Sequence, residues 1–138
     1  MAEALILDSE ALNALAHPAA RGSLALRARA IARVAHERGA LLRVPAPVLA
    51  DFCRGARFDA AVNQVLNREA VRVSDLTRRI AQRAGALLAK ARMSSERAVD
   101  AFVVATALEF DVSVIATGDA EDLARLSAPF NQITLMRL

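Results

Sequence analysis

Short apolar runs alternate along the chain with longer segments in which apolar residues recur at helical spacing. The runs predict buried strands at residues 5–7, 41–44, 70–73, 112–117 and 133–135. The segments between them predict helices at residues 10–16, 21–38, 48–54, 58–68, 76–92, 97–110 and 120–126. Apolar strands that alternate with helices are typical of a parallel sheet covered on both faces. The expected fold is therefore a three-layer α/β/α sandwich with a central, mostly parallel sheet.

Two aspartates follow predicted strands. Asp8 comes directly after the first strand, and Asp119 follows the fourth strand after Thr117 and Gly118. In α/β folds of this kind, ligands bind beyond the carboxyl ends of the strands, so we expect both carboxylates at such a site. Aspartate is also a favoured helix N-cap, and capping alone would explain these two positions.

Two further aspartates lie within helices that are otherwise apolar. Asp51 and Asp100 are each flanked by valine and phenylalanine residues. A carboxylate on such a helix must face a cation, a hydrogen-bond network or a water-filled cleft, because burying it unpaired costs several kcal/mol. Surface pairing with Arg54 or Arg97, each three residues away, is the structural alternative.

Four carboxylates at one cleft would repel one another, and a divalent cation relieves that repulsion. Oxygen ligands favour Mg²⁺ or Mn²⁺, and a site of this kind favours hydrolysis of a phosphodiester without a covalent nucleophile. The single cysteine, Cys53, and the two histidines exclude an intrachain disulfide and a zinc site built from Cys and His. His17 and His36 are expected at the surface, and neither is expected to act as a base.

Length and charge narrow the class of protein. The chain of 138 residues has the size of one globular domain, expected over residues 1–138. Its apolar runs fall short of the ~20 residues that a membrane-spanning helix needs, and no secretory signal pattern is present, so we expect a cytoplasmic protein without a membrane partner. Lys and Arg number 18 and Asp and Glu 15, so four acids in a metal site would leave +7 elsewhere. That charge suits a polyanion, although coding composition explains the abundance of arginine equally well.

Four motifs together resemble the PIN domain family, and more narrowly its VapC-type toxins. They are Leu-Asp8-Ser, the segment 44–55 that contains Asp51, Val-Asp100-Ala-Phe, and Thr117-Gly-Asp119 followed by Asp122. The motifs span nearly the whole chain and stand in the family's order. The resemblance implies a PIN-like fold and a metal-dependent endoribonuclease.

The resemblance also implies site residues and partners. The family's catalytic, metal-binding acids correspond to Asp8, Asp51, Asp100 and Asp119, with Mg²⁺ or Mn²⁺ as cofactor; accessory roles are expected for Thr117, Asp122 and Ser9, and a contact with RNA or a partner for Arg54. The implied substrate is structured RNA such as tRNA or ribosomal RNA. The implied partners are a VapB-like antitoxin that inhibits the enzyme and a second copy in a homodimer.

Position 51 departs from the family pattern and leaves two functions open. Most relatives carry Glu there, and the shorter Asp51 would reach a metal through water. The chain is then either an active nuclease toxin or a PIN-like domain that no longer cuts and binds RNA or protein. Glu10 is expected to be a solvated helix residue. An antitoxin helix is expected along residues 11–15 and 24–31, where periodicity alone does not separate an interface from the core.

Overall fold

Five parallel strands form one sheet within the part of the chain that the computed structural model describes, residues 3–138 without the side chains of Ala20 and Arg21. The strands are β1 (Glu3–Leu7), β2 (Leu41–Pro45), β3 (Arg72–Ser74), β4 (Val112–Thr117) and β5 (Ile133–Arg137). Their order is β3-β2-β1-β4-β5, and every neighbouring pair is parallel. The prediction of a parallel central sheet is confirmed.

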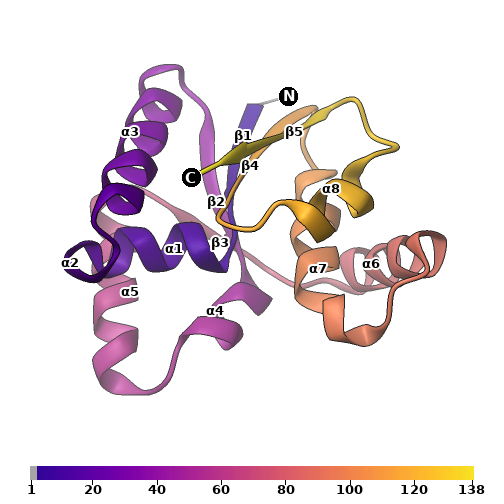
Figure 1. The fold of residues 1–138 in the computed structure, drawn as a ribbon, viewed down its shortest axis with the longest axis horizontal. Helices are drawn as coiled ribbons and strands as arrows, with labels where there is room; N and C mark the ends of the chain where they lie inside the picture. Colours follow the sequence, from indigo (N-terminus) through magenta and orange to yellow (C-terminus); the bar gives the residue numbers. More distant parts are fainter. Residues whose placement is uncertain (1–2) are drawn as a thin grey trace.

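Helices cover both faces of this sheet (Figure 1). One side holds α1 (Ser9–Ala16), α2 (Pro18–Arg21), α3 (Ser23–Glu37) and α5 (Ala56–Arg68), and the other holds α6 (Arg78–Ala91), α7 (Ala98–Ala107) and α8 (Glu121–Ser127). Helix α4 (Ala46–Phe52) follows β2 directly, and a 3₁₀ turn, η1 (Ser95–Arg97), precedes α7. The architecture is the predicted three-layer α/β/α sandwich.

Strand β1 and helix α7 form the centre of the core. The β1 residues from Ala4 to Leu7 are buried, and so are most residues of α7. An all-round apolar helix is stable only when its neighbours enclose it, and α7 packs against β1, β2 and β4 as well as α6 and α8. Its first turn, which carries Asp100, is therefore held in a fixed place at the edge of the sheet.

Several predicted boundaries differ from the observed ones for local reasons. The predicted helix 21–38 is divided at Gly22, whose positive φ of 51° separates α2 from α3. The predicted helix 97–110 begins only at Ala98, after η1, in which the Ser94 hydroxyl accepts a hydrogen bond from the Glu96 N–H. The third strand begins at Arg72 rather than at residue 70, because Ala70 has a φ of 53° and belongs to the preceding turn.

The apolar face of α1 belongs to the core. Its buried residues are Ala11, Leu12, Ala14 and Leu15, so the expected docking surface along residues 11–15 is wrong. On α3, by contrast, Leu26 is 69% exposed and Val34 is 50% exposed. Among residues 3–138, no helix has the length and apolar character needed to cross a bilayer.

Candidate acidic active site

Asp8 is the first residue after β1, at the carboxyl end of the two central strands. Its N–H donates a hydrogen bond to the Ala116 carbonyl oxygen on β4 (3.2 Å). Its carboxylate Oδ1 accepts a hydrogen bond from the Ala11 N–H (2.9 Å), which caps α1. The capping role is thus present, but the residue is only 7% exposed. Asp8 is therefore a buried acid as well as a cap.

Burial raises the pKa of the Asp8 carboxyl to about 6. The nearby Thr117 hydroxyl and the hydrogen bond from the Ala11 N–H lower this pKa, while the charges of Glu10 and Asp100 raise it. The raised value means that the surroundings of Asp8 do not fully compensate its negative charge. A positive charge at this point would favour the ionised carboxylate.

Thr117 fixes the backbone of Asp119 at the end of β4. The buried Thr117 Oγ1 accepts a hydrogen bond from the Asp119 N–H (3.0 Å) and lies 2.9 Å from the Asp119 carbonyl oxygen, to which it donates. The exposed Asp119 carboxylate accepts from the Glu121 N–H at the start of α8 (3.3 Å). Because β1 and β4 are parallel neighbours, Asp8 and Asp119 both lie beyond the carboxyl ends of the two central strands.

Asp51 lies in the last turn of α4, and Ser9 joins it to the end of β1. The Ser9 hydroxyl donates a hydrogen bond to Asp51 Oδ2 (2.8 Å). Arg54 donates instead to the carbonyl oxygens of Ala50 and Cys53, both at 2.8 Å. Among the described side chains no ion pair joins Asp51 to Arg54, so that structural alternative is wrong. The Arg54 guanidinium is engaged with the end of α4.

An aromatic cluster supports the end of α4. The His17 ring lies 5.7 Å, centroid to centroid, from both Phe52 and Phe58. His17 is half-buried and its Nε2 is enclosed, so its expected surface position is wrong, whereas His36 is exposed as expected. The cluster joins α1, α4 and α5 and limits the movement of the turn that carries Asp51.

Asp100 is the electrostatic centre of the acidic group. Burial raises the pKa of its carboxyl, and the charges of Asp122, Asp119 and Asp51 raise it as well, whereas Arg97 lowers it. The charge of Asp100 in turn raises the pKa of the Asp8 carboxyl. The structure therefore brings Asp8, Asp51 and Asp119 within electrostatic range of Asp100.

Arg97 is a basic residue of the site that the sequence offered only as a surface partner of Asp100. Its Nε lies 3.1 Å from Asp122 Oδ2, in an ion pair between η1 and the first turn of α8. Asp122 is also placed where a helix dipole favours a negative charge. Arg97 therefore offsets part of the negative charge on two acids.

Glu10 packs against Gly118, next to Asp119. A Cβ atom built on Gly118 would lie 2.7 Å from Glu10 Cβ and 2.9 Å from its Cγ, which is closer than side chains approach one another. Glu10 is half-buried and its charge raises the pKa of Asp8. The expectation of a solvated helix residue is wrong. The signal available in the sequence was its position two residues after a strand-end acid.

The site contains oxygen ligands, which fit a hard divalent cation such as Mg²⁺ or Mn²⁺. Burial, and secondarily the charges of neighbouring acids, raise the pKa of the Asp8 and Asp100 carboxyls, and a cation would favour their ionised form. Within residues 3–138, however, no three His, Cys, Asp or Glu side chains converge on one point at ligand distance. The carboxylates thus share one edge of the sheet as separate groups, and they must turn toward an ion to bind it together.

A parallel α/β/α sandwich with aspartates beyond its central strands defines an α/β domain suited to hydrolytic chemistry at an acidic site. The model of the PIN domain family matches residues 5–129. The chain belongs to the PIN domain family, whose members are typically metal-dependent nucleases. No curated protein matches the chain significantly.

Proposed function

We propose that this chain is a metal-dependent endoribonuclease and the VapC-type toxin of a type II toxin–antitoxin pair. Membership of the PIN family supports nuclease activity. The observation that carries the proposal is the electrostatic coupling of Asp100 to the carboxyls of Asp51, Asp119 and Asp122 at the carboxyl edge of the sheet. The proposed substrate is a structured RNA of the tRNA or ribosomal RNA class.

In this proposal Asp8, Asp51, Asp100 and Asp119 would hold Mg²⁺ or Mn²⁺. Such an ion, when bound, would make a water molecule more acidic and would offset negative charge on the phosphate. Residues of the chain position the acids. Ser9 holds the Asp51 carboxylate near the end of β1, and Thr117 fixes the backbone of the last acid.

Features beside α3 support a protein partner. Leu26 and Val34 are large apolar side chains on the outer surface of this helix. An apolar hollow of about 250 Å³ lies between α3 and the sheet, and its walls include Ile31, Val34, Val114 and Met136. Exposed apolar surface of this kind is typical of interaction sites. A VapB-like antitoxin and a second copy of the chain are the partners proposed for it.

The second candidate function is a PIN domain that binds RNA or protein without cutting. Two features favour it: the resemblance to PIN domains implies Glu at position 51, where this chain carries Asp51, and the described acids do not converge on one point. The shorter carboxylate is also already engaged by Ser9. This candidate keeps the fold and the positive charge expected outside the acidic site but predicts no chelator-sensitive cleavage.

Cleavage of total cellular RNA by the purified chain separates the two candidates. We expect discrete fragments with Mg²⁺ or Mn²⁺, no fragments with chelator, and no fragments from Asp100→Asn. Asp75→Asn removes an exposed carboxylate that follows the edge strand β3, which β2 separates from β1. It is the matched control, with activity expected to equal that of the native chain. If the folded native chain, free of any partner, cuts none of a broad RNA pool with either metal, the binding module is the better description.

A further inference from the structure

A hollow lined by basic side chains lies beside α3, remote from the acidic site. We call it the basic hollow. Its volume is about 630 Å³, and its charged and imidazole side chains are Arg29, Arg33 and His36 from α3, and Arg68 and Glu69 from the end of α5. Figure 1 shows α3 and α5 on the side of the sheet opposite α6, α7 and α8. None of these side chains belongs to the acidic site.

Arg29 and Arg33 are exposed, and no described side chain is an anionic partner for either. In the described part of the chain neither forms an ion pair or a side-chain hydrogen bond. They are four residues apart on α3, so their side chains are neighbours on one face of the helix. Like charges at this spacing destabilise a helix. The hollow is therefore a place where a bound anion would relieve a repulsion that the chain itself leaves uncompensated.

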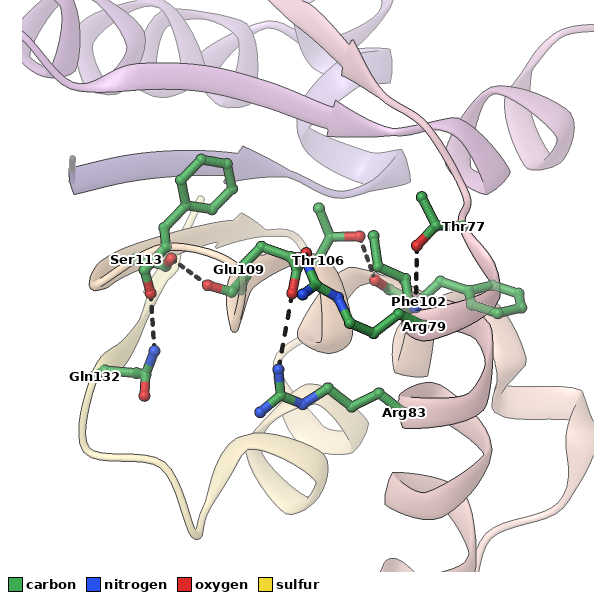
Figure 2. Close-up of polar contacts among 11 residues, drawn as sticks. Thr77, Arg79, Arg83, Phe102, Thr106, Glu109, Ser113 and Gln132 are labelled. Atoms are coloured by element: carbon green, nitrogen blue, oxygen red, sulfur yellow. Dashed lines mark hydrogen bonds and ion pairs between the residues drawn. The ribbon is translucent and has the colours of Figure 1, made fainter. Parts of the chain in front are cut away.

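A pair of arginines on α6 shows the contrast. Arg79 and Arg83 have the same spacing, but both lie against Glu109 at the end of α7, as Figure 2 shows. Glu69 is the one acid among the described residues that line the basic hollow, and it is already paired, because its Oε1 lies 3.1 Å from Arg68 Nε. The excess positive charge of the hollow thus belongs to Arg29 and Arg33.

The distance between the hollow and the acidic site sets the minimum size of a ligand that could contact both. Helix α3 ends just before β2 begins, and α5 ends just before β3 begins. The part of the hollow formed by His36 and Arg68, which are in the last turns of these helices, therefore lies toward the amino ends of the strands, whereas the aspartates lie beyond the carboxyl ends. A strand of five residues spans about 15 Å at roughly 3.3 Å per residue. A single nucleotide does not bridge such a separation.

We propose that the basic hollow binds the phosphodiester backbone of a structured RNA at a distance from the site of cleavage. Guanidinium groups match phosphate in geometry as well as charge. Contacts to the backbone position a nucleic acid without reading its sequence. That the bound polyanion is RNA rests on the proposed function. The charge and shape of the hollow are independent of that proposal. An acidic protein segment is the competing ligand, which the experiment distinguishes.

The first measurement is equilibrium binding of a folded tRNA in chelator, with Asp100→Asn as the parent protein so that cleavage plays no part. Arg29→Gln/Arg33→Gln is compared with Arg79→Gln/Arg83→Gln, which removes the same charge at the same spacing on α6. We expect the α3 variant to bind RNA about tenfold more weakly at 0.1 M salt. The slope of log affinity against log salt concentration should become shallower by the equivalent of about one to two phosphate contacts. The α6 variant should bind nearly as its parent does. Arg29→Lys/Arg33→Lys should restore most of the affinity, which a purely structural role would not predict.

The second measurement is cleavage by the same variants in the otherwise native chain. The α3 variant should show a raised KM and an unchanged kcat on the folded RNA, and native kinetics on a short oligonucleotide that carries the cleavage site. Equal RNA binding by the α3 and α6 variants overturns the proposal. The proposal is also overturned if the α3 variant keeps its affinity for RNA but loses affinity for an acidic helical peptide, since the hollow would then be a protein-binding site. If the native chain cleaves no RNA but the α3 and α6 variants still differ in RNA binding, the RNA-binding role of the hollow is supported and the proposed nuclease activity is wrong.

Discussion

The Ser9 hydroxyl donates a hydrogen bond to the Asp51 carboxylate and so joins the end of β1 to the end of α4. The two residues are separated by 42 positions in the sequence, and their contact sets where the least typical acid of the site lies. Asp51 is exposed, so without this bond its side chain would be free to adopt other rotamers.

Ser9→Ala should therefore lower RNA cleavage by about tenfold, the lower end of what loss of a residue supporting a metal ligand costs. Its effect on the free energy of unfolding should stay below about 1 kcal/mol, because the bond is exposed to water. Cleavage kinetics and urea unfolding measure the two effects. Ser95→Ala, at an exposed position of η1, is the control. Native cleavage by Ser9→Ala would show that the bond does not position Asp51.

Asp51→Glu should retain or raise cleavage. The longer side chain supplies the Glu that the resemblance to PIN domains implies at this position, and the exposed end of α4 leaves space for one more methylene. The rate of metal-dependent cleavage at saturating Mn²⁺ measures this effect. A loss of activity would mean that the site is built around the shorter side chain and its bond to Ser9.

Gly118→Ala should destabilise the fold by about 1–3 kcal/mol, the usual cost of an added methyl in a packed position. The new Cβ would meet Glu10 Cβ and Cγ. Glu10→Ala removes the Cγ contact but keeps the Cβ contact, so the double variant should recover only part of the loss. Chemical unfolding of the two single variants and the double variant gives the coupling between the residues. Additive effects would contradict the close packing of Glu10 on Gly118.

Asp8→Asn should stabilise the metal-free protein at pH 8. The folded-state pKa of about 6 lies above the ordinary value of 3.8, so the folded chain binds more protons than the unfolded chain between these two values. The stability associated with Asp8 is complete below about pH 4 and is lost as the pH rises through 6. The shift corresponds to about 3 kcal/mol at alkaline pH.

The measurement for Asp8→Asn is urea unfolding in chelator at pH 5, 6.5 and 8. The amide oxygen of Asn can still accept from the Ala11 N–H, so the cap of α1 should survive. The gain over the native chain should grow with pH, while Asp75→Asn, at an exposed position, should show no such trend. A destabilised Asp8→Asn at pH 8 would mean that capping by the charged group outweighs its burial.

The sequence predicted the sheet and its parallel strands, because apolar strands and buried helices leave a clear periodic pattern. It did not predict the break at Gly22 or the late start of β3 at Arg72, since both depend on backbone conformations with positive φ at Gly22 and Ala70. Periodicity alone also could not separate the core face of α1 from an exposed face.

Within the site, the positions of the four aspartates followed from strand ends and from acids in apolar helices. The roles of Glu10 and Arg97 did not, because each depends on a tertiary neighbour, Gly118 for one and Asp122 for the other. A residue two positions after a strand-end acid is spaced like a helix surface residue in the sequence. It becomes a site residue only once β4 and β1 are adjacent.

Mn²⁺ binding to the native chain and to four single variants tests most directly whether the aspartates act as one site. Asp8→Asn, Asp51→Asn, Asp100→Asn and Asp119→Asn are compared by calorimetric titration, with Asp75→Asn as control. We expect one class of site, weakened at least tenfold by each of the four substitutions and unchanged by the control. Native Mn²⁺ affinity in Asp100→Asn, the variant at the electrostatic centre of the group, would contradict a shared metal site.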